Sequence, residues 1–265
     1  MQRVHPAGLF TFFVVLFLIA PILIVIGSSV SSTGYMSFPP SKPSLRWFVE
    51  LLNNPEWLFG FGVTLLLAVL ASTISVIVAL CVALLLARRR IPARAGIELL
   101  VLLPLVFPHA ALAVAVLALV RDLHLIGTFT GVLLAHILVT LPFAYRPIMA
   151  SLSKLDISLE EAAMSLRATP WTTFRRVTLP LIRPGLITAM LFSVIISFDE
   201  LTITMFLIGP TFTTLPVKIF SQLQDNASPI IAAVATVLIV STATLVLIIN
   251  RFFGLEFFAD PEKQR

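Results

Sequence analysis

Long apolar runs separated by short polar segments recur six times along the chain, at about residues 9–28, 60–87, 97–120, 129–150, 184–208 and 229–250. A helix that crosses the hydrocarbon core of a membrane needs about 20 mostly apolar residues. The six runs and their loops use the whole chain and leave no room for a separate soluble domain. The pattern predicts an all-α membrane protein, with six transmembrane helices in a single transmembrane domain over residues 1–265.

Composition agrees with this pattern. Hydrophobic residues make up 58% of the chain and charged residues 12%, and the mean hydropathy is +1.05, whereas an ordinary soluble domain is roughly 45–50% apolar. The first apolar run continues from residue 9 to 26, beyond the roughly 7–15-residue core of a cleaved signal peptide. We therefore predict a retained helix. Cys81 is the single cysteine, so no intrachain disulfide is possible.

The positive charges indicate the orientation in the membrane. If the N-terminus is cytoplasmic, all but four of the 18 Lys and Arg residues lie in cytoplasmic segments, and the four are Lys42, Arg46, Arg121 and Lys218. Cytoplasmic loops carry an excess of Lys and Arg, so both termini are predicted to be cytoplasmic. The net charge of +5 is thereby explained as a topology signal, and no nucleic-acid partner is expected.

The cytoplasmic loop at about residues 151–183 has the clearest helix signals outside the spans. Ser158 with Glu161 three residues later fits a capping box. Thr169 followed by Pro170 fits a second helix start, and Pro180 and Pro184 should limit its length. This predicts two short helices whose apolar face is not fully buried. One interpretation is a connector on the membrane surface, with its basic residues near lipid phosphates.

Spacing within this loop favours a second interpretation. Glu-Ala-Ala at 161–163 and Val-x-Leu-Pro at 177–180 resemble the EAA loop of ABC importer permeases, at the matching separation. The resemblance implies the type I importer permease fold and a pair of coupling helices that bind a cytoplasmic ATPase dimer. The residues it assigns to ATPase coupling are Glu161, Ala162, Ala163, Arg167, Thr169, Pro170, Trp171, Leu179 and Pro180.

Arg167 departs from the family pattern, because it stands where relatives carry a glycine. A glycine there allows positive φ, which costs other residues roughly 1–2 kcal/mol. Either the junction takes another turn or it is strained. The chain also lacks the G-x-x-x-x-G-K-[ST] phosphate-binding motif. We therefore expect no enzyme activity and no cofactor in this chain, with ATP and Mg used by the partner ATPase.

Further stretches at 38–48, 198–210 and 213–221 resemble the second membrane subunit of spermidine/putrescine-type systems. This implies a bacterial inner-membrane importer with a second, homologous permease and an extracytoplasmic solute-binding protein. Relatives of this layout also carry opines, aminophosphonates or iron, so those solutes stay open. An autonomous secondary transporter is a rival from another class. An intramembrane enzyme is disfavoured, because no paired-His zinc motif or nucleophile motif is present.

Asp199 and Glu200 are adjacent acids in the outer half of the fifth apolar run. Intramembrane acids usually face a cavity or a partner, so we predict that Asp199, Glu200 and Thr202 line a path for a cationic solute, with Thr202 one helical turn from Asp199. The alternatives are a structural carboxylate bonded to a neighbouring helix, or a helix break that leaves it wet. His109 and His136 are expected to be packing partners, without the ligand spacing of a metal site.

Overall fold

The computed structural model describes residues 6–40, 42–89, 91–226 and 228–253. Within them the chain is helical, and the sole β contact is an isolated bridge between Ser31 and Pro43. Contacts divide the chain into two compact units. The first unit contains residues 1–59 and 218–265, and the second contains residues 60–217. The all-α prediction is confirmed.

The first unit is built around two long apolar helices. Helix α1 (Pro6–Ser29) packs against α13 (Pro229–Phe253), which also contacts the short helix α2 (Arg46–Asn53). The indole of Trp47 in α2 donates to the carbonyl of Ser31 across 2.8 Å and fastens the loop that follows α1. Most side chains of α1 stay exposed, including Phe10 and Phe17. Such a surface is suited to lipid or to another membrane subunit.

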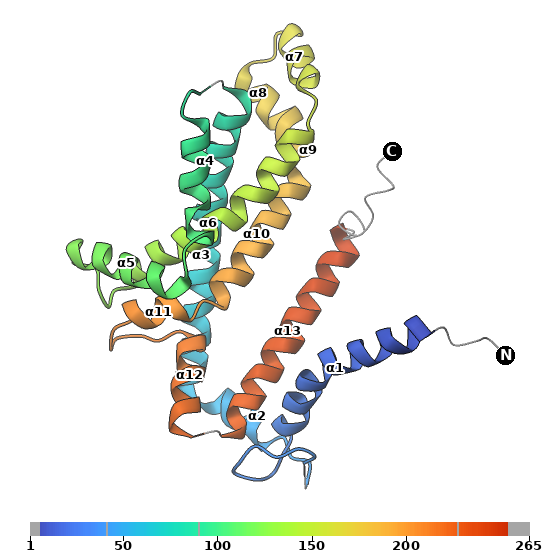
Figure 1. The fold of residues 1–265 in the computed structure, drawn as a ribbon, viewed down its shortest axis with the longest axis vertical. Helices are drawn as coiled ribbons and strands as arrows, with labels where there is room; N and C mark the ends of the chain where they lie inside the picture. The colour runs from blue at the N-terminus through green and yellow to red at the C-terminus, as the bar shows by residue number, and fades with distance from the viewer. Residues whose placement is uncertain (1–5, 41, 90, 227, 254–265) are drawn as a thin grey trace, which may run out of the picture. The chain divides into compact units, whose positions relative to one another are not determined.

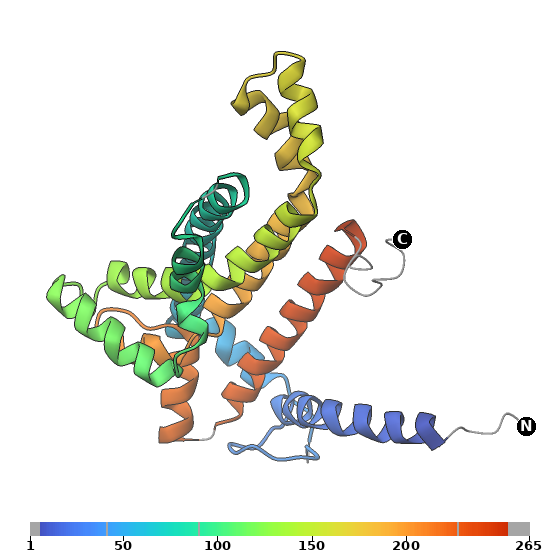
Figure 2. The ribbon, with the colours of Figure 1, turned by 45° about the horizontal axis from the view of Figure 1, so that its top comes forward.

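The second unit has two apolar cores along α3 (Pro55–Arg88) and α6 (Phe129–Lys154). Near one end, α5 (His109–Asp122) and α11 (Thr202–Leu207) complete the first core. Toward the other end, α4 (Arg94–Leu102) and α10 (Arg183–Phe198) complete the second. Helices α6 and α10 run side by side in both views (Figures 1 and 2). The loop between them carries α7 (Ile157–Ser165), α8 (Pro170–Thr173) and α9 (Leu179–Leu181).

Three helices are long and apolar enough to cross a membrane, namely Leu9–Ser29, Pro55–Arg88 and Phe129–Lys154. Two helix pairs qualify only when combined across a bend, and the described part of α13 forms a shorter apolar helix at Pro229–Thr244. By length and composition the described residues thus contain three spans, or up to five. The count of six and the cytoplasmic placement of both termini stay predictions.

Two of the predicted spans are not the straight helices that periodicity suggested. Residues 97–120 break between Leu105 and His109 with a bend of 108°. Pro104 and Pro108 lie at this break, and proline lacks the N–H that would continue the helical bonds. Residues 184–208 break after Phe198, where α10 ends and α11 begins at Thr202. The expectation of a continuous helix through Asp199 was therefore wrong, and the alternative of a helix break that leaves this acid exposed is the one observed.

The close packing of α10 on α6 depends on Gly185. A β-carbon at this position would lie 2.7 Å from Cβ of Ser151 and 2.8 Å from the carbonyl oxygen of Pro147. Both distances are shorter than side chains tolerate, and one of the atoms is backbone that cannot rotate away. The missing side chain lets the two helices that flank the loop approach each other.

We expect Gly185→Ala to lower the free energy of unfolding by about 1–3 kcal/mol through overpacking. Thermal unfolding of the purified protein in detergent measures the effect. Gly62→Ala is the matched control, because a β-carbon at Gly62 in α3 has nothing within 4 Å. Equal stability of the two variants would contradict this account of the α6–α10 contact.

Candidate functional site

The first helix of the 151–183 loop begins at a different cap from the one predicted. The carboxylate of Asp156 accepts from the backbone N–H of Ser158 at 2.9 Å, and α7 starts at Ile157. The predicted capping box of Ser158 with Glu161 was therefore wrong, because Asp156 supplies the acceptor two residues earlier. The hydrogen bonds from Ser158 lower the pKa of Asp156, so the cap is fully charged at neutral pH.

The end of α7 is a Schellman motif that places Arg167 in the left-handed region. The N–H of Ala168 donates to the carbonyl of Ala163 at 3.1 Å, and the N–H of Arg167 donates to Met164 at 2.9 Å. These are the two bonds that define the motif. Arg167 has a φ of 65°, in the region that favours glycine. Of the two possibilities left open by the sequence, the strained junction is the one observed.

The second helix starts as predicted and ends between the two prolines expected to limit it. The hydroxyl of Thr169 accepts from the N–H of Thr172 at 3.2 Å, and Pro170 occupies the first turn. From Phe174 to Thr178 the backbone is π-helical, and it then passes into α9, which contains Pro180 and ends at Leu181. The chain bends there by 68°, and Pro184 lies in the first turn of α10.

This pair of short helices leaves a large apolar surface uncovered. Helix α7 has no buried residue. Leu166 is 85% exposed and Trp171 is 67% exposed, and the Trp171 ring stacks on Phe174 with centroids 5.5 Å apart. The other residues assigned to coupling divide into two groups. The half-buried ones are Ala163 and Leu179, and the exposed ones are Glu161, Ala162, Arg167, Thr169, Pro170 and Pro180.

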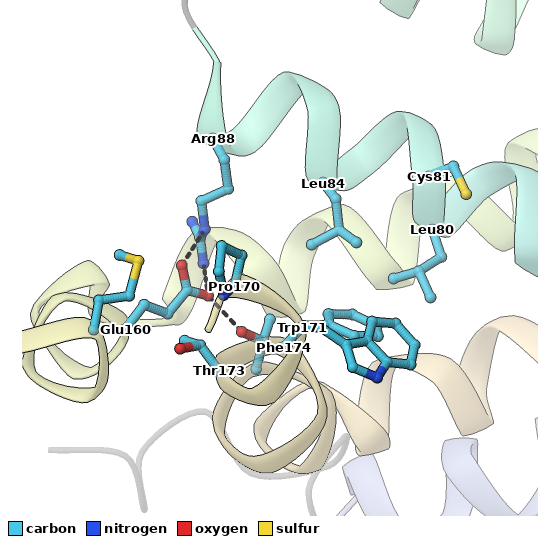
Figure 3. A pocket seen from close by; sticks show the side chains of 11 residues that line it. Leu80, Cys81, Leu84, Arg88, Glu160, Pro170, Trp171, Thr173 and Phe174 are labelled. Atoms are coloured by element: carbon cyan, nitrogen blue, oxygen red, sulfur yellow. Dashed lines mark hydrogen bonds and ion pairs between the residues drawn. The ribbon is translucent and has the colours of Figure 1, made fainter. Parts of the chain in front are cut away.

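A polar cluster joins this loop to the end of α3 (Figure 3). Arg88 Nη2 donates to Glu160 Oε1 at 3.0 Å, and Arg88 Nε lies 2.8 Å from Oε2 as an ion pair without hydrogen-bond geometry. The hydroxyl of Thr178 also donates to Oε1, at 2.7 Å. Sequence reasoning selected Glu161 and missed Glu160. The available signal was a carboxylate in the first helical turn, which does not reveal its partner.

An apolar pocket of about 610 Å³ lies beside this cluster. One wall comes from Leu80, Cys81 and Leu84 of α3, and the facing wall comes from the second short helix (Figure 3). Met164 of α7 also lines the pocket. The stacked rings of Trp171 and Phe174 line it, as do Pro170, Thr173 and Thr178. The pocket therefore separates much of the loop from α3.

At the other end of the second unit, the helix break places the two acids in different environments. Asp199 is the C-cap residue of α10 and is exposed, while Glu200 is 6% exposed. Glu200 Oε1 accepts from the N–H of Ile203 at 2.9 Å, and Oε2 lies 3.8 Å from Nδ1 of His109. Thr202 is half-buried at the start of α11. The polar stripe expected for Asp199 and Thr202 on one helix face was wrong, because the helix ends between them.

His136 ties both sides of this break to α6. Its side chain is buried, with Nδ1 2.7 Å from Ser197 Oγ and Nε2 2.9 Å from Thr204 Oγ1. The Thr204 hydroxyl donates to the carbonyl of Glu200 at 3.0 Å, so it accepts from Nε2–H of His136. The imidazole thus bridges α10 and α11. The expectation of a packing role for His136 agrees with this geometry.

The polar network continues into α3 on the other side of His136. The hydroxyl of Thr140 donates to the carbonyl of His136 at 2.8 Å and lies 2.7 Å from the hydroxyl of Ser75. Within the described parts of the chain, no three His, Cys, Asp or Glu side chains lie close enough together to hold a metal ion. These buried groups are therefore engaged in holding helices together.

Comparison with known proteins gives consistent results. The model of a family described as "Binding-protein-dependent transport system inner membrane component" matches residues 79–255. The putrescine transport system permease protein PotI of Escherichia coli K12 is 34% identical, over 94% of this chain and 89% of its own length. The spermidine/putrescine transport system permease protein PotC of Haemophilus influenzae is 29% identical, over 94% and 96%. The putative 2-aminoethylphosphonate permease PhnV of Salmonella typhimurium is also 29% identical, over 88% of each chain.

Solved structures show the same fold. A bacterial ABC transporter for import of the acidic polysaccharide alginate has a chain that aligns with a TM-score of 0.72 and 17% identity, covering 94% of this chain and 95% of that one. The same transporter type with its alginate-bound periplasmic protein aligns equally well, at 18% identity. The permease fold expected from the loop motif is thereby confirmed.

We expect Arg167→Gly to raise the free energy of unfolding by about 1 kcal/mol, because glycine adopts positive φ without the steric cost that arginine bears. Thermal unfolding in detergent, or amide exchange at residues 166–168, measures the gain. Arg167→Ala removes the same charge and keeps a β-carbon, so it should give no gain. Equal stabilisation by both variants would identify charge, and not backbone strain, as the cause.

Proposed function

The chain belongs to the family of binding-protein-dependent transport system inner membrane components, and from this membership we propose that its solute is a polyamine, putrescine or spermidine, moved inward by alternating access. As a member, it is a multi-pass inner-membrane permease of an ABC importer and not an enzyme. The names of the relatives at 34% and 29% identity support the polyamine assignment. The aminophosphonate relative at 29% keeps a zwitterionic solute as the second candidate.

The exposed carboxylate of Asp199 is the observation that carries the polyamine proposal. Among the described residues, no side chain is paired with it, whereas Glu200 already caps α11 and faces His109. A polyamine loses hydration as it enters a membrane path, and a nearby carboxylate offsets that cost. In this scheme Asp199 meets the ammonium groups in transit, Thr202 lies nearby, and Glu200 holds the break that exposes Asp199.

Weak contacts with the solute suit this role. Selection by a separate solute-binding protein removes the need for a tight site in the permease, and a tight site would slow release. A second, homologous permease would complete the path, and membrane lipid would cover the outer surface. The exposed apolar side chains of α1 would provide contact area for the second permease and for lipid.

Energy would come from a cytoplasmic ATPase dimer that uses ATP and Mg. The proposed contact surface is the exposed apolar face of α7 and α8 around Leu166 and Trp171, together with the coupling residues between Glu161 and Pro180. A face of this kind on so short a loop is unusual for a protein without a partner. A compact element between two membrane helices can convert movement of a soluble subunit into a tilt of those helices.

We expect Asp199→Asn to lower the initial rate of putrescine and spermidine uptake about tenfold, equivalent to roughly 1.4 kcal/mol in the transport barrier. The assay uses labelled solute and cells that express the complete set of transport subunits, with membrane abundance checked. Asp122→Asn is the control, since Asp122 is exposed and already paired with Arg121 at 3.0 Å.

Three outcomes separate the candidates. Normal uptake by Asp199→Asn would remove Asp199 from the path. Absence of polyamine uptake by the wild type, with uptake of an aminophosphonate, would favour the zwitterionic solute. Loss of wild-type uptake when an uncoupler collapses the proton gradient while ATP is maintained would point to a secondary transporter.

We expect Leu166→Ser to reduce the amount of ATPase that copurifies with the permease, because it removes the most exposed apolar side chain of the proposed docking face. Leu45→Ser is the matched control, since Leu45 is 65% exposed and lies in the predicted outer loop. Copurification in detergent at equal permease amounts measures the change. Unchanged ATPase recovery with Leu166→Ser would favour the interpretation that this loop rests on the lipid surface.

A further inference from the structure

We propose that Arg88, Glu160 and Thr178 form a link that transmits movement of the 151–183 loop into α3. This inference rests on the proposed function, in which an ATPase moves the loop. The backbone connects the loop only to α6 and α10. Without a link of this kind, α3 would receive the movement only through packing against those helices.

The geometry of the cluster suits a mechanical connection. Both carboxylate oxygens of Glu160 are engaged by the Arg88 guanidinium, at 3.0 and 2.8 Å, and Oε1 also accepts from Thr178. Glu160 lies in the first turn of α7, Thr178 ends the π-helical segment, and Arg88 ends α3. One carboxylate therefore holds three elements together. The guanidinium–carboxylate contact combines one charge-assisted hydrogen bond, from Nη2, with an ion pair at Nε.

Burial makes this contact stronger than a surface ion pair. The Glu160 side chain is 12% exposed and the Arg88 side chain 21% exposed, so water and salt screen the charges only in part. Moving α7 away from α3 and from the π-helical segment would break the contacts of one carboxylate with both Arg88 and Thr178 at once. The end of α3 is therefore tied to the loop at this point.

The apolar pocket explains why this one cluster matters. It lies between the α3 residues Leu80 and Leu84 and the loop residues Trp171 and Phe174 (Figure 3). Packing between α3 and the loop is therefore incomplete beside the ion pair. The Arg88–Glu160 contact is thus a connection at a place where the packing of α3 against the loop has a gap.

The test is the ratio of solute imported to ATP hydrolysed by the complete transporter in proteoliposomes. We expect Arg88→Gln and Glu160→Gln each to lower this ratio about threefold or more, the range in which mutations along a coupling route act, while the ATPase stays bound. Arg89→Gln, at the exposed neighbouring arginine, is the matched control and should keep the ratio. The charge swap Arg88→Glu with Glu160→Arg should restore much of it.

A link and a purely structural ion pair give different results. If the pair only stabilises the fold, import and ATP hydrolysis fall together with the amount of assembled transporter, and an unchanged ratio overturns the proposal. Where Arg88→Gln assembles poorly, Arg88→Lys keeps the charge but loses the two-point contact, and its ratio is read in the same way. Wild-type import that does not depend on ATP would instead overturn the proposed function.

Discussion

Inside a membrane no water is available for backbone polar groups, so a chain that breaks a helix there must supply hydrogen-bond partners from its own side chains. The break between α10 and α11 meets this requirement with polar side chains, one of which, Glu200, the sequence alone suggested for a solute path. Glu200 caps Ile203, and His136 bridges Ser197 and Thr204. These contacts leave Asp199 as the adjacent acid that is not used to hold the break.

The cytoplasmic loop satisfies its helix ends with short-range hydrogen bonds. Asp156 and Thr169 cap its two helices, and a Schellman motif joins them through Arg167. Because these bonds are local, the loop holds its shape while its apolar face stays exposed. A small rigid element with an uncovered apolar face is suited to receive a partner subunit. Its firm polar attachment to α3 is the Arg88–Glu160 pair.

Several features were predictable because they depend on neighbours in sequence. Apolar runs of membrane length located α1, α3, α6 and the start of α13. The Thr169–Pro170 start followed from capping rules that span a few residues, whereas at Arg167 the sequence left two junctions open and the structure decided between them. The same rules were wrong for Ser158, since Asp156 competed as a cap.

The sequence by itself therefore determined the helical membrane class, the family and the position of the coupling loop, because hydropathy and motif spacing are properties of consecutive residues. The tertiary structure alone decided which polar groups meet. Arg88 and Glu160 are 72 positions apart, and His136 is separated from Ser197 by 61 and from Thr204 by 68. Each of these pairs forms because helices far apart in the sequence pack side by side. Hydrophobic periodicity does not encode which helices pack together. It therefore could not distinguish Glu160 from Glu161, or the capping carboxylate of Glu200 from the exposed one of Asp199.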